Sequence, residues 1–427
     1  MKESASRLHE IMEGKYMRIK VLFILCFMLI EVCNLYAAEA VSIGAVLPLS
    51  GKFAAFGNKA LQGVELALEK HNSTEAGKKR PVRLLIKDSK GLPKVAEKAV
   101  SELNMDGVDV IVGPILATTA DAAAKRAQEL KIPIVTMTQK EGITGIGGWV
   151  FRNGMTNAAQ AKGLVDYASR QGVKKVAVLY PDNQFGRELT AVFTAEILKL
   201  GGEVVASKDY KEGQTDFGPE IKALVGPDFL EKMQAYTEEK EKEFKEAEKS
   251  KAKPTPTPEI EPVEEMERPM PDFDAVFIPD YADRVGLIVP QLAFYDVRDV
   301  KLLGISGWNS PKLINMAGAF LSDDVMIVDG FFSGSLRPQV MDFVGAYRKT
   351  FGEEPGIVEA LAYDTMGIVL SLIPDGGDSR GGIKNTILKI KDYQGVSGNI
   401  TFSGSDAERS FYYLTVNRGV IEEITDH

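Results

Sequence analysis

The chain has 427 residues, of which 44% are hydrophobic and 26% are charged, and its formal net charge is −9. This length and composition predict a folded protein of two or three domains. The acidic balance argues against nucleic acid or an anionic membrane surface as a partner.

The N-terminal segment has the features of a secretory signal. Basic residues precede an apolar run from 21 to 30, and small residues follow it. This order is typical of a cleaved signal peptide, and the run is too short to span a bilayer. We therefore expect residues 1–38 to be a signal peptide and the mature chain to be periplasmic, without an integral membrane segment.

Cysteine and histidine are scarce. Cys26 and Cys33 both lie in the expected signal peptide, and the acidic and branched residues before Cys33 disfavour a lipoprotein anchor. His71 lies at a predicted helix end, and the remaining histidines lie near the two ends of the chain. Because no nucleophile and base can be paired, we expect no enzymatic activity, no metal site and no cofactor.

Phosphate binding is also disfavoured. The glycines of the first strand and helix are Gly44, Gly51, Gly57 and Gly63, which match neither G-x-G-x-x-G nor G-x-x-x-x-G-K-[ST].

From residue 41 onward, short apolar runs alternate with helical segments. Continuous apolar strands indicate parallel sheets that helices cover on both faces. In the first series the expected strands and the helices that follow them are 42–49, 60–71, 82–89, 93–105, 109–114, 118–130 and 132–138. In the second series the expected elements are 158–171, 174–183, 185–200, 201–210, 217–224, 273–281, 283–295, 300–308 and 323–332.

Residues 226–272 interrupt the second series. Residues 231–253 hold seven Glu and seven Lys, with opposite charges four residues apart, which predicts a solvated single helix. The segment KPTPTPEIEP then predicts an extended linker. A tolerated surface insertion is the favoured interpretation, and an arm that docks a partner is the alternative. Residues 399–424 alternate apolar and polar side chains about Asn417-Arg418-Gly419, which predicts a terminal hairpin.

Five stretches resemble the type I periplasmic binding proteins of the leucine/isoleucine/valine-binding group. They are SIGAVLPLSGKFAAFGNKALQGVELALE, VDVIVGPILATTADAAA, KIPIVTMTQKEGIT, KKVAVLYPDNQFGRELTAVF and EALAYDTMGIV. The resemblance covers about residues 41–225 and 273–420. It implies an α/β protein of two doubly wound parallel-sheet lobes that close on a ligand about a hinge of three crossings.

The resemblance also implies domain boundaries. The crossings would fall near Asn153, Asp329 and Val396. The implied lobes are residues 41–153 with 330–396, and residues 154–329 with 397–427.

The ligand contacts of the family's first lobe correspond to an aromatic residue, a helix start and a segment after the fourth strand. These positions are Phe56, Ala117, Thr118, Thr119, Thr138, Gln139 and Lys140. Alternatives remain open: Phe56 as a hydrophobic staple, and Thr118 or Thr119 as a helix cap. Lys140 and Glu141 depart from the small residues of the family, which suggests a more charged ligand, an interlobe salt bridge or a plain surface position.

The contacts of the second lobe correspond to Phe185, Tyr281, Ser306 and Trp308. The aromatic side chains are expected to wall a small ligand. Family members that bind amino acids carry an acid after the strand ending LLG, where this chain has Gly304-Ile305-Ser306. Asp280 or Glu141 could replace it, because an ammonium without a carboxylate partner is costly to bury.

Two functions follow from these resemblances. The favoured one is a periplasmic receptor that closes on an amino-acid-like or other small polar ligand and delivers it to an ABC permease. The alternative is an envelope protein that binds and activates a penicillin-binding protein, because TMTQKEGIT and GFFSGSLRPQVMDFVGAYRKTFGEEP are similar to such domains.

Overall fold

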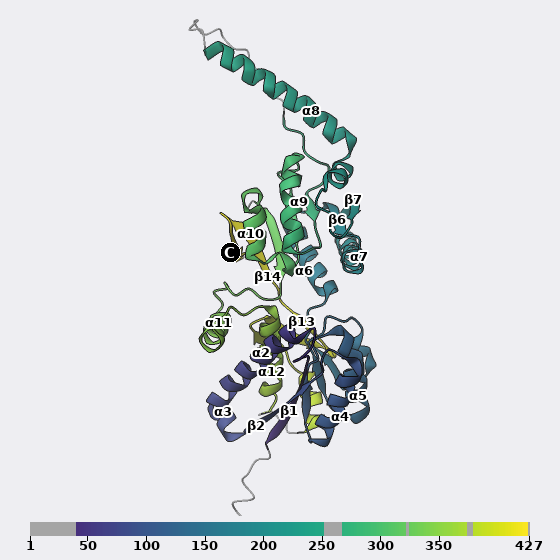
Figure 1. Ribbon diagram of the computed structural model, residues 1–427, viewed down its shortest axis with the longest axis vertical. Helices are drawn as coiled ribbons and strands as arrows, with labels where there is room; N and C mark the ends of the chain where they lie inside the picture. The colour runs from purple at the N-terminus through teal and green to yellow at the C-terminus, as the bar shows by residue number, and fades with distance from the viewer. Residues whose placement is uncertain (1–39, 252–266, 322–323, 374–378, 426–427) are drawn as a thin grey trace, which may run out of the picture.

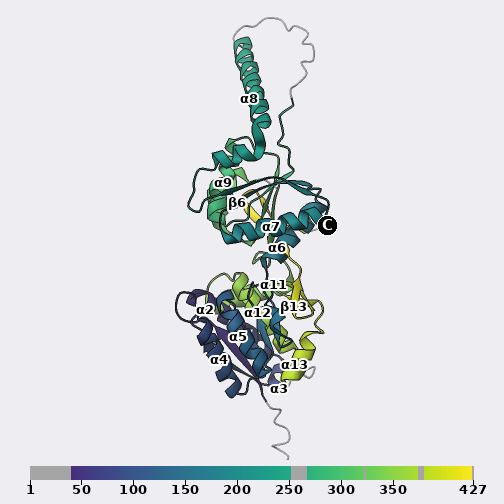
Figure 2. The ribbon, with the colours of Figure 1, turned by 90° about the vertical axis from the view of Figure 1, so that its right-hand side faces the viewer.

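The computed structural model describes residues 40–251, 267–321, 324–373 and 379–425. The expected signal peptide, both cysteines and the segment KPTPTPEIEP lie outside these residues. The described chain forms two α/β lobes stacked along the long axis of the molecule, with a narrow waist between them (Figure 1, Figure 2). Each lobe contains one mainly parallel sheet, so the predicted fold class is confirmed.

The N-terminal lobe contains an eight-stranded sheet in the order β11-β12-β13-β5-β4-β3-β1-β2. Its strands are β1 Val41–Leu47, β2 Val82–Asp88, β3 Val110–Val112, β4 Ile134–Thr136, β5 Val150–Arg152, β11 Tyr393–Gly395, β12 Gly398–Ser403 and β13 Asp406–Arg409. Its helices are α2 Ala54–Ser73, α3 Glu75–Lys79, α4 Pro93–Met105, α5 Ala117–Leu130, η1 Ile143–Ile146, α11 Pro338–Phe351, α12 Ile357–Ser371 and α13 Arg380–Ile387.

Helices cover both faces of this sheet, which explains its uninterrupted apolar strands. Successive residues of one strand enter different cores: Ala45 packs in the core shared with α2 and α12, and Val46 packs in the core shared with α4 and α5. Every residue of β1 is buried, whereas β2 at the sheet edge is partly exposed.

The C-terminal lobe contains a seven-stranded sheet in the order β15-β14-β10-β9-β8-β6-β7. Its strands are β6 Lys175–Pro181, β7 Glu203–Tyr210, β8 Ala275–Phe277, β9 Lys301–Gly304, β10 Val325–Asp329, β14 Tyr412–Asn417 and β15 Val420–Glu423. Its helices are α6 Asn157–Arg170, α7 Gln184–Lys199, α8 Gly218–Lys251, α9 Ala282–Phe294, η2 Ser306–Trp308, α10 Pro311–Ala317 and η3 Gly318–Phe320. The predicted terminal hairpin is confirmed as β14 and β15, with Arg418 and Gly419 at positive φ in its turn.

The chain passes between the lobes three times. The first two passages follow β5 and β10, and the third lies between β13 and β14. The expected third crossing near Val396 is wrong, because β12 and β13 still belong to the sheet of the N-terminal lobe. Residue Ile400 of β12 pairs with Tyr393 and with Arg409, so this ladder extends the N-terminal sheet before the chain crosses.

Helix α8 forms most of the predicted insertion. It is interrupted at Gly226 (φ 77°, ψ 166°), which Pro227 follows. Beyond this break the helix projects from the end of the C-terminal lobe that faces away from the waist (Figure 1, Figure 2). Phe229 and Met233 are buried near its base, whereas residues 241–248 are exposed. The predicted solvated helix is confirmed.

Candidate functional site

The candidate site lies at the waist, between the strand ends of the two lobes, and we call this region the cleft. The chain leaves β5 and β10 directly for the other lobe, so the carboxyl ends of these strands lie at the waist. Their parallel neighbours end on the same side of each sheet. Because ligands of open α/β sheets bind outside the carboxyl ends of the strands, the two lobes present their binding edges to each other.

The loop after β1 forms one rim of this cleft. The Asp88 carboxylate at the end of β2 accepts a hydrogen bond from the backbone N–H of Leu49, at 2.9 Å, and from that of Lys90, at 2.8 Å. Phe56 lies in the first turn of α2 and is 52% exposed.

The start of α5 is a second element of the N-terminal wall. Leu116 is its N-cap residue, and no side chain caps it. Ala117 and Thr118 are exposed, whereas Thr119 is fully buried and its hydroxyl donates to the Leu116 carbonyl at 3.1 Å. The capping alternative for Thr118 and Thr119 is therefore wrong. An uncapped helix start presents backbone N–H groups that suit an anion.

The segment after β4 contributes charge to the same wall. The Lys140 ammonium pairs with Asp121, and the Arg152 guanidinium lies 3.2 Å from the Glu141 carboxylate. All of these residues belong to the N-terminal lobe, so the interlobe salt bridge is not formed. Gln139 is exposed.

Thr138 does not face the cleft. Its side chain is fully buried, and its hydroxyl accepts a hydrogen bond from the Lys140 backbone N–H at 3.2 Å. It therefore orders the segment that carries Lys140 instead of reaching a ligand in this conformation.

An aromatic pair dominates the opposing wall on the C-terminal lobe. The rings of Phe185 and Tyr281 are stacked, with centroids 5.6 Å apart and planes 16° apart. Phe185 lies in the first turn of α7, and Tyr281 precedes α9 and is 56% exposed. Burial and the neighbouring Asp280 carboxylate raise the pKa of Tyr281, which stays a neutral phenol. The two aromatic positions predicted from sequence are thus brought together.

A hollow of about 750 Å³ adjoins this pair. Loops after β6, β7 and β8 line it, and its charged side chains are Glu212, Asp280, Asp283 and Arg284. The Lys312 ammonium pairs with Asp283 at 3.1 Å, so the three carboxylates face two cations, Arg284 and Lys312, and the hollow keeps a small excess of negative charge. This excess suits the positive end of a ligand, and the aromatic faces add a cation–π contribution.

Asp280 is fixed in this hollow by its neighbours. Its carboxylate accepts a hydrogen bond from the Tyr210 hydroxyl at 2.5 Å and from the Tyr281 backbone N–H at 2.7 Å. Each carboxylate oxygen can accept a second hydrogen bond, so Asp280 retains capacity for a ligand donor. Tyr210 was not predicted as a site residue, although its place at the end of β7, before a turn, is a signal that sequence analysis can use.

Two further predicted ligand contacts, Ser306 and Trp308, form hydrogen bonds within the C-terminal lobe. The Ser306 hydroxyl after β9 donates to the side-chain carbonyl of Gln160 on α6 at 2.9 Å, a partner that the sequence did not indicate. Trp308 is fully buried, and its indole N–H donates to the Ile278 carbonyl at 3.1 Å. The prediction that Trp308 walls the ligand is therefore wrong, because its ring packs in the core of the C-terminal lobe.

A buried polar network ties the first crossing to the N-terminal lobe. The Arg409 guanidinium donates to the side-chain oxygen of Asn153 at 2.6 Å and to the Ser397 hydroxyl at 2.8 Å. The Ser397 hydroxyl in turn donates to the Asp364 carboxylate at 2.5 Å. Burial lowers the pKa of Arg409 to about 10 and raises the pKa of Asp364. The Tyr412 hydroxyl of the other lobe donates to the Val396 carbonyl at 2.7 Å beside this network.

The described residues contain no group of three or more His, Cys, Asp or Glu side chains arranged to hold a metal ion. Nor does any helix among them combine the length and the apolar character needed to cross a membrane.

Comparison with known proteins identifies a family. The family described as "Periplasmic binding protein" matches residues 40–419. A curated relative, Leu/Ile/Val-binding protein homolog 3 of Brucella melitensis, is 30% identical over 187 residues, which are 43% of this chain and 51% of the relative. The chain therefore spans about half the length of the curated relatives that it matches.

Solved structures are similar over most of the chain. A protein of Rhodospirillum rubrum, described as a branched-chain amino acid ABC transporter, has a TM-score of 0.75 and 21% identity, covering 90% of this chain and 100% of that one. A solute-binding protein of Rhodopseudomonas palustris in complex with 3,4-dihydroxybenzoic acid has a TM-score of 0.59 and 23% identity, covering 89% and 94%. At these identities the structural likeness establishes the fold.

Proposed function

This chain belongs to the periplasmic binding protein family, and from that premise we propose that it is a periplasmic receptor for a small polar solute, which it delivers to an ABC-type importer. The observation that carries the proposal is the stacked Phe185–Tyr281 pair beside Asp280, at the strand ends that face the N-terminal lobe. No catalytic step is part of the proposal.

Hinge closure supplies the mechanism. A ligand that touches both walls stabilises the closed form, because only that form offers both sets of contacts. Its binding energy shifts the equilibrium by no more than the difference between its affinities for the two forms. The three crossings are the segments that would absorb the rotation.

The two walls offer different groups, which favours an amino-acid-like ligand. The start of α5 offers N–H groups to a carboxylate, and beside it the charges of Lys140 and Asp121 compensate each other. The opposing hollow offers Asp280 and the aromatic faces to an ammonium. We infer that Asp280 takes the place of the acid that is missing after β9. The relatives whose descriptions name branched-chain amino acids agree with this ligand class.

The first test is thermal unfolding of residues 39–427 against amino acids, amides, small carboxylates and peptidoglycan fragments. A ligand present at about 1,000 times its Kd adds about 4 kcal/mol to the free energy of unfolding and raises the midpoint clearly. We expect one class of small solute to do so. Replacing Tyr281 by Ala should abolish the shift, whereas F294A, which removes an exposed ring at the far end of α9, should leave it intact.

A ligand pair tests the role of Asp280. Leucine and 4-methylpentanoate differ only in the ammonium group. D280N should therefore weaken the binding of leucine about tenfold, or 1.4 kcal/mol, and leave the affinity for 4-methylpentanoate nearly unchanged. Calorimetry measures both affinities. Equal losses for the two ligands would refute the assignment of Asp280 while leaving the receptor function in place.

The second candidate function is binding of an envelope protein such as a penicillin-binding protein. Helix α8 favours it, because an exposed helical arm projects from the lobe and takes no part in the cleft (Figure 2). If no solute in the panel shifts the unfolding midpoint, this candidate replaces the first.

A further inference from the structure

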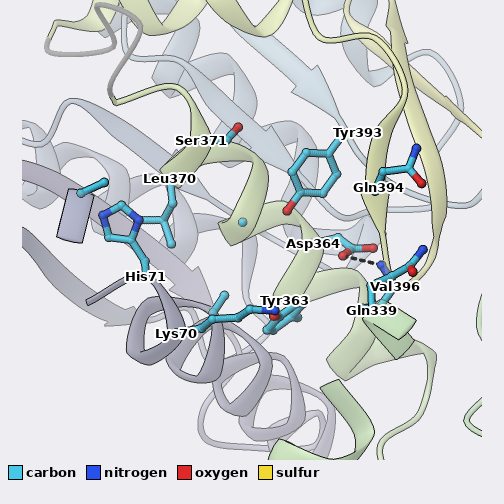
Figure 3. Close-up of a pocket in the computed structure, with 13 residues that line it drawn as sticks. Lys70, His71, Gln339, Tyr363, Asp364, Leu370, Ser371, Tyr393, Gln394 and Val396 are labelled. Carbon is cyan, nitrogen blue, oxygen red and sulfur yellow. Dashed lines mark hydrogen bonds between the residues drawn. The ribbon is translucent and has the colours of Figure 1, made fainter. Parts of the chain in front are cut away.

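A second hollow lies in the N-terminal lobe, outside the interlobe cleft. It has a volume of about 290 Å³ and lies between α2, α12 and β11 (Figure 3). Lys70 and His71 in the last turns of α2 form one side of it, and Phe56 at the cleft end of that helix lies about 20 Å away along the axis. The hollow is therefore a separate site.

One side of this hollow carries a cation. In the described part of the chain, the Lys70 ammonium makes no ion pair with a carboxylate, and it lies 5.9 Å from the centre of the Tyr363 ring. The Nε2 atom of His71 has no hydrogen-bond partner among the described residues, but protein atoms cover it, so it is not open to the hollow. His71 therefore lines the hollow without offering Nε2 to a ligand, and burial lowers the pKa of its imidazole.

The side chains of Gln339 and Gln394 lie across the hollow from His71 (Figure 3). The Gln394 NH₂ group donates to the Asp392 carbonyl at 3.1 Å.

Much of the remaining lining is apolar. Ala67, Leu370 and Val396 contribute aliphatic surface, and the rings of Tyr363 and Tyr393 contribute aromatic surface. Aromatic and aliphatic surface beside one ammonium that has no carboxylate partner matches a flat ring with one anionic group.

The one carboxyl group in the wall does not oppose an anion. The Asp364 carboxylate accepts hydrogen bonds from the backbone N–H groups of Val396, at 2.9 Å, and Ser397, at 2.7 Å. It also accepts from the Ser397 hydroxyl, so these donors and the nearby Arg409 compensate its charge.

We propose that this hollow is a second binding site, specific for a small aromatic carboxylate, whose carboxylate lies against Lys70 and whose ring lies against Leu370 and the two tyrosines. The site does not depend on the function of the interlobe cleft.

The test is a calorimetric titration of residues 39–427 with benzoate, carried out in a Y281A background so that binding in the cleft is suppressed. Two variants probe the hollow. Ala76 is exposed at its rim, so A76F should close the hollow without disturbing the core. K70M removes the cation. K78M is the control, because Lys78 is an exposed lysine of α3 that does not line the hollow.

We expect benzoate to bind the Y281A protein, and A76F and K70M to weaken this binding at least about tenfold, while K78M changes it less than about twofold. Unfolding midpoints equal to that of the parent confirm that each variant is folded. The proposal is overturned if Y281A does not bind benzoate, or if A76F and K70M leave its binding unchanged. Neither result bears on the cleft, which the solute panel tests separately.

Discussion

Asp329 lies at the point where the chain leaves β10 for the N-terminal lobe. Its carboxyl group is buried and accepts hydrogen bonds from the Asn309 side chain at 2.9 Å and from the Gly330 backbone N–H at 2.6 Å. Burial raises the pKa of Asp329 to about 7, although these hydrogen bonds oppose the rise. The folded chain therefore holds a proton here that the unfolded chain releases at a much lower pH.

This proton makes stability depend on pH. Between about pH 4 and pH 7 the folded state binds more protons at Asp329 than the unfolded state, so the free energy of unfolding falls as pH rises. The contribution is fully present below pH 4 and is lost as pH passes through 7, with an upper limit of roughly 4 kcal/mol. We expect the free energy of unfolding of D329N, measured with urea, to fall less between pH 5 and pH 8 than that of the parent protein. Parallel pH profiles for the two proteins would contradict this.

Trp308 and Tyr281 show which residue roles sequence can indicate. Both are aromatic residues shortly after a strand, and both were expected to contact the ligand. Tyr281 lies on the surface, whereas Trp308 fills the space beside Gly304, where an added Cβ would lie 2.2 Å from the Trp308 ring. Residue type and spacing predict the strand end, but the direction of a side chain depends on packing that the sequence does not specify.

The buried role of Trp308 leads to a specific expectation. W308F removes the hydrogen bond to Ile278 and part of a fully buried ring, so it should lower the free energy of unfolding by about 2 kcal/mol. Its affinity for the solute should stay within about twofold of the parent. Denaturant unfolding and calorimetry check the two values. A loss of affinity like that of Y281A, without a loss of stability, would show that Trp308 does contact the ligand.

At the scale of elements, the contact between α2 and α12 depends on a glycine. A Cβ added at Gly63 would lie 2.3 Å from the Glu359 carbonyl oxygen, so any larger residue forces the two helices apart. By contrast, Gly345 of α11 has open space around it.

Replacing these two glycines by alanine should change the free energy of unfolding in opposite directions. We expect G63A to destabilise the fold by about 1–3 kcal/mol through overpacking. G345A should stabilise it by about 0.5–1 kcal/mol, because alanine costs less backbone entropy in a helix. Urea unfolding of both variants provides the measurement, and equal effects would contradict the close contact.

Most elements could be predicted from apolar runs and helix periodicity. The strands of the C-terminal tail show where that approach ends. Residues 399–424 alternate in the expected way, yet β12 and β13 pair in one lobe and β14 and β15 in the other. Alternation indicates that a segment is a half-buried strand, but it carries no information about which sheet the strand joins.

At the scale of the whole molecule, the hinge strands and the open side of the cleft are separated within each sheet. The crossings leave from the interior strands β5, β10 and β13, whereas β1 and β6 are next to the edges formed by β2 and β7. Rotation about the crossings therefore moves the loops after β1 and β6 through a large distance. The projecting part of α8 lies beyond the other end of the C-terminal lobe and does not obstruct this motion (Figure 1).

The central claim, closure on a solute, is tested most directly by the distance between these two loops. Lys52 and Gln184 are exposed on them, and residues 39–427 contain no cysteine, so K52C and Q184C can be labelled specifically for energy transfer. We predict that the solute which raises the unfolding midpoint also shortens this distance, and that Y281A abolishes the change. A bound solute that leaves the distance unaltered would contradict the account.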